Sequence, residues 1–139
     1  KKIILDPFQK GNISDYWINE GFVWLMHARS VAPNNPKNIG GKHPDGSIGR
    51  GVQYPFIKPH SGQYHAEWDE SKLEPWKEVV RKVIKYHCIH ESSLECITTE
   101  FIPATDYGEG STYSLLENAV ACANWIRSEI TRISKYEER

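Results

Sequence analysis

Three residues with metal-ligating and acid–base side chains each stand at or near the end of an apolar stretch. Asp6 follows residues 3–5, His27 follows residues 22–26, and Glu100 lies near the end of residues 94–102. Parallel strands of one sheet end at the same edge, so the three side chains would converge there. Two carboxylates and an imidazole suit Mn²⁺, Zn²⁺, Co²⁺ or Mg²⁺. The residues leave one alternative open, in which Asp6 caps a turn, Glu100 forms an ion pair and His27 is a core histidine.

Alternating strand and helix patterns surround these three residues. The expected order is strand, short helix, strand, long loop, helix, strand and helix, which is typical of βα units around a parallel sheet. The expected strands are residues 2–6, 22–27 and 94–102. Ser14 and Gly21 have the types found at the start and just after the end of a short helix, and Asp69 precedes an amphipathic helix. Ser111 or Ser114 is expected to cap the last helix.

Three further groups of residues carry expectations. The amphipathic helix is expected to have a basic outer face of Lys72, Lys77, Arg81, Lys82 and Lys85. The five tryptophans are expected mostly in the core, with Trp24 or Trp68 a candidate to stack on a ring-shaped ligand. Residues 32–65 are rich in Gly and Pro and form an unusually long connection. Apolar residues are interleaved in this stretch, and they favour an ordered loop.

Length and charge exclude several classes of protein. The 139 residues fit one domain, residues 1–139, and 12% aromatic side chains argue against disorder. A net charge of −1 argues against a nucleic-acid partner, and no apolar run is long enough for a membrane span. Cys88, Cys96 and Cys122 show no paired spacing, so reduced thiols in a cytoplasmic protein are expected. The first residue is Lys1, and we expect the sequence to be a piece of a longer protein.

Four short motifs carry a resemblance to a known family. They are Leu5-Asp6-Pro7-Phe8-Gln9, Met26-His27-Ala28-Arg29, Gly49-Arg50-Gly51-Val52-Gln53-Tyr54 and Thr98-Thr99-Glu100-Phe101. In this order they resemble the C-terminal part of the xylose-isomerase-like TIM barrels, which are sugar and sugar-phosphate isomerases and epimerases such as the tagatose and psicose 3-epimerases. The resemblance implies an α/β fold of about three βα units, strands six to eight of a (β/α)8 barrel.

The family resemblance also implies a site. Asp6, His27 and Glu100 match its metal ligands at the ends of strands six, seven and eight, and Glu100 would also move a proton. Mn²⁺ is the first expectation for the metal, with Mg²⁺, Co²⁺ and Zn²⁺ as alternatives. Gln9, which stands where the family often has a histidine, is expected to bind substrate together with Arg29 and Arg50. The family's fourth ligand, a glutamate on an earlier strand, has no counterpart in this sequence.

The implied activity is a divalent-metal-dependent isomerase or epimerase that transfers a proton through an enediolate. Two alternatives remain open: a metal phosphodiesterase of the apurinic endonuclease type on the same barrel, and a non-catalytic α/β binding domain. The near-neutral charge counts against the phosphodiesterase, which needs a basic DNA-binding face. The expected ligand is a small sugar, and neither a nucleic acid nor a membrane is expected as a partner. Either a second copy of the chain or a missing N-terminal barrel half is expected to cover the open strand edges.

Overall fold

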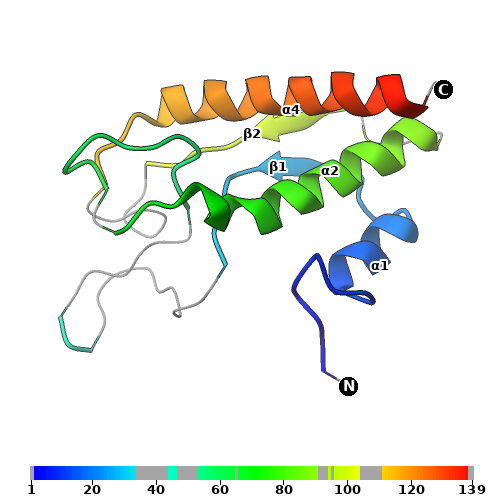
Figure 1. Ribbon diagram of the computed structural model, residues 1–139, viewed down its shortest axis with the longest axis horizontal. Coiled ribbons are helices and arrows are strands. Elements are labelled where there is room, and N and C mark those ends of the chain that lie inside the picture. The colour runs from blue at the N-terminus through cyan, green and yellow to red at the C-terminus, as the bar shows by residue number, and fades with distance from the viewer. Residues whose placement is uncertain are drawn as a thin grey trace.

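The computed structural model describes residues 2–33, 44–46, 53–64, 66–90, 94, 96–103 and 111–137. Its elements are α1 (Ile13–Asn19), β1 (Met26–Ala28), the 3-10 helix η1 (Glu70–Leu73), α2 (Glu74–Ile89), β2 (Ile97–Thr99) and α4 (Leu115–Glu137). The two long helices α2 and α4 lie together against the sheet and run opposite to its strands (Figure 1). In the described part of the chain, no helix is both long enough and apolar enough to span a membrane.

The sheet has two parallel strands in the described residues. Met26 is opposite Ile97, His27 is opposite Thr98 and Ala28 is opposite Thr99. The sequence predicted strands at both places and a parallel relation between them, and the structure confirms both, with strands shorter than predicted. Helix α2 lies in the connection between them, as in a βα unit.

The prediction of a strand at residues 2–6 is wrong. No strand is found there, and the carbonyl of Ile4 accepts a hydrogen bond from the backbone of Ile13 at the start of α1. Ile3 and Leu5 are 64% and 77% exposed, and the N-terminal segment runs away from the sheet (Figure 1). An apolar run indicates a tendency to be buried, but a strand also needs a neighbouring strand to bond.

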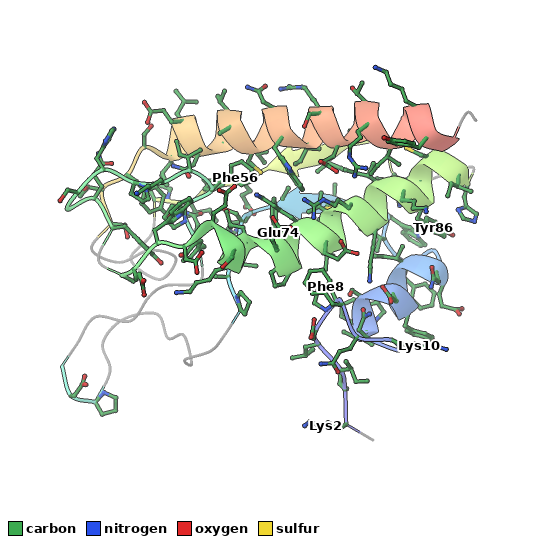
Figure 2. The ribbon with its side chains drawn as sticks, viewed as in Figure 1. Lys2, Phe8, Lys10, Phe56, Glu74 and Tyr86 are labelled. Carbon is green, nitrogen blue, oxygen red and sulfur yellow. The ribbon has the colours of Figure 1, made fainter. Side chains whose placement is uncertain are left out.

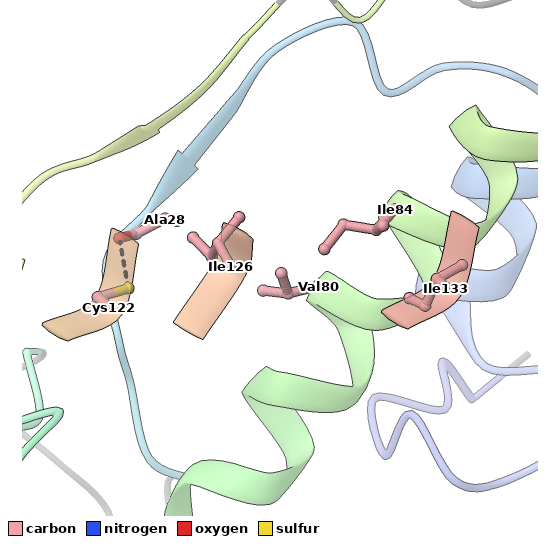
Figure 3. Close-up of a cluster of buried hydrophobic side chains, with 6 residues drawn as sticks. All are labelled: Ala28, Val80, Ile84, Cys122, Ile126 and Ile133. Atoms are coloured by element: carbon pink, nitrogen blue, oxygen red, sulfur yellow. Dashed lines mark hydrogen bonds between the residues drawn. The ribbon is translucent and has the colours of Figure 1, made fainter. Parts of the chain in front are cut away.

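The core lies between the helices and one face of the sheet. Its buried members are Ala28, Val80, Ile84, Cys122, Ile126 and Ile133 (Figure 3). Met26 packs against this cluster, whereas Leu25 and His27 are exposed, which is the alternation expected of a half-buried strand. The expectation that residues 22–27 are covered on both faces is therefore wrong within the described residues.

An aromatic cluster joins the helices, and it buries a lysine that was expected on the outer face. Phe56, which is labelled in Figure 2, packs against both Trp76 of α2 and Trp125 of α4, with ring centroids 6.0 and 5.9 Å away. The two tryptophan rings also contact each other, at 5.6 Å between centroids. The ammonium of Lys77 lies 5.6 Å from the Phe56 ring and 5.8 Å from the Trp125 ring. Because Lys77 is only 7% exposed, the expected basic face is wrong at this position.

Two of the five tryptophans are not in the core. Trp17 is 52% exposed and Trp24 is 69% exposed, so the expectation of mostly buried tryptophans is wrong for both. They belong to the N-terminal part of the chain, where β1 lacks a second neighbouring strand in the described residues. Trp68, Trp76 and Trp125 are half-buried.

The helix termini agree largely with the sequence. The Asp69 carboxylate accepts a hydrogen bond from the Ser71 backbone at 2.9 Å, but it caps η1, which leads directly into α2, rather than α2 itself. The Ser114 hydroxyl accepts a hydrogen bond from the Glu117 backbone at 3.2 Å. At α1 the cap is Asn12 rather than Ser14, since the Asn12 side chain accepts from the backbone of Asp15. Gly21 follows α1 with φ +73°, a left-handed conformation that favours glycine.

Candidate functional site

His27 and Glu100 lie side by side on neighbouring parallel strands. His27 is directly opposite Thr98, and Glu100 lies two residues further along, on the same face of the sheet. The His27 Nδ1 and the Glu100 Oε2 are 3.3 Å apart. The two side chains are 52% and 37% exposed, so the pair lies open to solvent on the face that the helices leave uncovered.

Arg29 holds Glu100 in this position. Its guanidinium donates a 2.7 Å hydrogen bond from Nη2 to the Glu100 Oε2, and a longer one of 3.3 Å from Nε to the Glu100 backbone carbonyl. The Arg29 side chain is only 18% exposed, which makes the charge-assisted bond less screened than a surface ion pair. One arginine therefore fixes both the carboxylate and the backbone of Glu100.

The contact between His27 and Glu100 has a chemical consequence. An ionised carboxylate only accepts hydrogen bonds, so the neutral imidazole must carry its proton on Nδ1 to bond with it. The other ring nitrogen, Nε2, then presents a lone pair. Such a nitrogen can bind a metal ion or accept a proton, and a carboxylate on the opposite nitrogen is the usual way of orienting a metal-binding histidine.

Asp6 is engaged elsewhere. Its carboxylate accepts hydrogen bonds from the backbone of Phe8 at 3.0 Å and from the Gln9 side chain at 3.1 Å, as in a turn closed by an aspartate. Across the described ranges, no group of three or more His, Cys, Asp or Glu side chains is arranged to hold a metal ion. The structure thus brings together two of the three predicted ligands, and Asp6 and Glu100 make the turn and the ion pair of the alternative interpretation. His27 is exposed and is not a core histidine.

Several predicted residues fall outside the described part of the chain. Arg50 and the flanking Gly49 and Gly51 belong to this group, so the proposed contact of Arg50 with substrate stays a prediction. The two tryptophans considered for stacking on a sugar are both described. Trp24 donates from its ring nitrogen to the carbonyl of Gly21, and Trp68 donates to the carbonyl of Pro55.

A mostly apolar pocket of about 630 Å³ lies beside Asp6, within the size range of small-molecule sites. Its walls include Leu5, Phe8, Val31, Trp76 and Val79. Asp6 is the charged residue among the lining residues. This lining suits an apolar group better than a sugar, whose hydroxyls need hydrogen-bond partners.

Gln53 is a residue near the site that the sequence did not single out as functional. It is 1% exposed, and its Oε1 accepts a 2.9 Å hydrogen bond from the backbone of Ile102, two residues after Glu100. Its Nε2 donates a 3.0 Å bond to the hydroxyl of Tyr113. Burial raises the pKa of the Tyr113 hydroxyl, which keeps it protonated, while the bond from Gln53 opposes that shift. The local sequence gives no signal that Gln53 is buried, because a polar residue between apolar neighbours such as Val52 and Tyr54 is typical of a side chain that faces solvent.

Comparison with known proteins adds nothing to this geometry: no family model, no curated protein and no solved structure matches the chain.

Proposed function

We propose that this chain is the C-terminal part of a (β/α)8 barrel and belongs to a divalent-metal-dependent sugar or sugar-phosphate isomerase or epimerase. The observation that carries the proposal is the pair formed by His27 and Glu100, with 3.3 Å between Nδ1 and Oε2. The two side chains stand toward the C-terminal ends of neighbouring parallel strands linked through a helix, where enzymes of α/β architecture place their chemistry. The order of the four family-like motifs supports the same function.

The residues fit a metal ion in part. The His27 Nε2 can supply a nitrogen donor that suits Mn²⁺ and its neighbours, while Glu100 orients the ring through Nδ1. The Glu100 carboxylate would supply an oxygen donor to the same ion only if its contact with Nδ1 opened. Asp6 would complete the set only if its turn opened, since its carboxylate bonds to Phe8 and Gln9. A bound divalent cation would supply polarisation of the sugar carbonyl.

The roles of the side chains follow from their contacts. Glu100 would be one of two carboxylates, on opposite faces of the substrate, that remove and return a proton at the carbon beside the carbonyl, and it is half-exposed and adjoins His27. Arg29 keeps this carboxylate in one orientation, and its guanidinium adds positive charge where negative charge develops on the substrate. Gln9 and Arg50 remain proposed substrate contacts.

Metal binding tests the site directly. Calorimetric titration of the chain with Mn²⁺ should show binding that His27→Ala and Glu100→Gln each weaken by at least about tenfold. His60→Ala and Glu117→Gln are matched controls, because both residues are exposed and lie elsewhere. Unchanged affinity in the two site variants would contradict the proposal.

The reaction class needs a second assay. An isomerase or epimerase acting by proton transfer should incorporate deuterium from D₂O into a ketose at the carbon next to the carbonyl, in a reaction that Glu100→Gln abolishes. Cleavage of an oligonucleotide with an abasic site, without deuterium exchange, would favour the phosphodiesterase instead.

A further inference from the structure

The pairing of β1 and β2 ends just before the candidate site. The ladder runs from Met26 opposite Ile97 to Ala28 opposite Thr99, whereas Glu100 lies one residue beyond it. Something other than the ladder must therefore fix the chain that carries the carboxylate. A glutamate one residue past the end of a strand would otherwise share the mobility of the loop that follows.

A segment from the long connection bridges the two strand ends. The backbone of Tyr54 donates a 2.8 Å hydrogen bond to the carbonyl of Ser30, which follows β1 closely. The preceding residue, Gln53, accepts the backbone hydrogen of Ile102, beyond the end of β2. Residues 53 and 54 thus bond to the chain that follows each of the two strands.

The geometry of Gln53 leaves one orientation for its amide. The backbone nitrogen of Ile102 is a donor, so the group facing it at 2.9 Å must be the carbonyl oxygen of the Gln53 side chain. The amide nitrogen then faces the hydroxyl of Tyr113 at 3.0 Å. Tyr113 itself is 6% exposed, and its ring contacts Tyr64 edge to face. Both ends of the glutamine side chain are held, which restricts its rotamers.

We propose that Gln53 is a positioning residue, which fixes Glu100 against His27 by holding the backbone of Ile102 beside the end of β1. Arg29 acts on Glu100 from the strand side, and Gln53 acts from the loop side. The effect of Gln53 on the contact between His27 and Glu100 is inferred from the structure alone, whereas the effect of Gln53 on metal binding rests on the proposed function. A purely structural glutamine would lower stability without changing the contact between the two site residues.

The ring-nitrogen chemical shifts of His27, measured by NMR at fixed pH, report this contact. Glu100→Gln sets the full displacement expected when the carboxylate is lost. Gln53→Met keeps the size of the side chain but removes both hydrogen bonds, and it should move the shifts by more than half of that displacement. Tyr113→Phe is the matched control, because it removes only the bond at the amide nitrogen and should leave the shifts near their wild-type values.

Two further variants keep the test decisive. Gln53→Glu retains an acceptor for Ile102 and should restore the wild-type shifts. If Gln53→Met does not fold, Gln53→Asn withdraws the acceptor by one methylene while remaining polar, and the same displacement is expected. Wild-type shifts in every folded Gln53 variant that loses the Ile102 bond would overturn the proposal, as would shifts that do not respond to Glu100→Gln.

Metal titration separates this inference from the proposed function. If the wild-type chain binds Mn²⁺, Gln53→Met should lower the affinity by about tenfold or more, as loss of a supporting residue does at other metal sites. Absence of Mn²⁺ binding by the wild type would remove the proposed function but leave the NMR comparison valid. If Gln53→Met binds Mn²⁺ as the wild type does and leaves the His27 shifts unchanged, the role of Gln53 is excluded while the proposed function stands.

Discussion

Arg29 and Glu100 meet across the ends of two neighbouring parallel strands, with 2.7 Å between the Arg29 Nη2 and the Glu100 Oε2. The same arginine also reaches the Glu100 backbone carbonyl through Nε. A planar guanidinium can make both contacts together, whereas a lysine ammonium offers its donors from a single point. The strand ends therefore depend on arginine at this position rather than on positive charge alone.

Replacement of Arg29 should show this dependence. We expect Arg29→Met to lower the free energy of unfolding by about 1–2 kcal/mol, since it removes a charge-assisted hydrogen bond that is mostly screened from water. Arg29→Lys should recover less than half of the loss. Urea denaturation measures both, and Arg127→Met on the exposed surface of α4 should change stability by less than about 0.5 kcal/mol. Equal stability of the Arg29→Lys variant and the wild type would contradict the argument.

The Cys122 thiol should make stability fall at alkaline pH. Burial raises its pKa from 9.0 to about 12. Below pH 9 the thiol is protonated in both states, but above it the unfolded thiol ionises while the folded one does not. The free energy of unfolding should then fall by up to about 1.4 kcal/mol per pH unit until about pH 12.

Denaturation from about pH 8 to pH 10 tests this contribution. Cys122→Ala removes the ionisation, so its stability should fall less steeply with pH than that of the wild type, whatever its stability at neutral pH. Cys88→Ala is the control, because Cys88 is exposed and should leave the slope unchanged. Identical slopes in the Cys122→Ala variant and the wild type would show that the buried thiol does not contribute.

The sequence predicted those elements whose signals are local. The amphipathic spacing after Asp69 and the caps at Asp69 and Ser114 depend on neighbouring residues only, and both appear in the structure. The parallel relation of β1 and β2 follows from the helix between them. The strand at residues 2–6 failed because a strand depends on a distant partner, which the local pattern does not reveal.

The candidate site divides in the same way. His27 and Glu100 were placed together correctly, because strand alternation and parallel pairing determine where they lie. The engagement of Asp6 in its own turn and the contact from Arg29 depend on side-chain geometry that residue spacing does not give. Gln53 was missed as a positioning residue for a similar reason, since its two partners are separated from it by tens of residues in the chain.

The buried Lys77 should tolerate an apolar replacement. Its ammonium pairs with Glu70 at 3.4 Å and Glu74 at 3.5 Å, but both glutamates are well exposed and remain hydrated when the lysine is removed. We expect Lys77→Met, which keeps the stem that packs on Phe56 and Trp125, to change the free energy of unfolding by less than about 1 kcal/mol.

Lys77→Ala is the informative comparison. It removes the packed stem as well as the charge, and should cost about 2 kcal/mol. Thermal or urea denaturation of the two variants separates packing from charge. A large loss in Lys77→Met, close to that of Lys77→Ala, would show instead that the ion pairs and cation–π contacts carry the stability.

The chain should associate through its N-terminal apolar surface. This surface is defined by six exposed side chains of the first 25 residues: Ile3, Leu5, Phe8, Phe22, Trp24 and Leu25. Phe22, Trp24 and Leu25 come just before β1, which has β2 as its one paired neighbour in the described residues, and open strand edges with exposed apolar residues favour association. Light scattering at low micromolar concentration should therefore give a mass above the 16.0 kDa of one chain, and Phe22→Glu or Trp24→Glu should lower it.

Leu116→Glu is the matched control, because Leu116 is 75% exposed but lies on α4, and it should leave the mass unchanged. A wild-type monomer that unfolds cooperatively would show that the chain is stable without a partner on this surface.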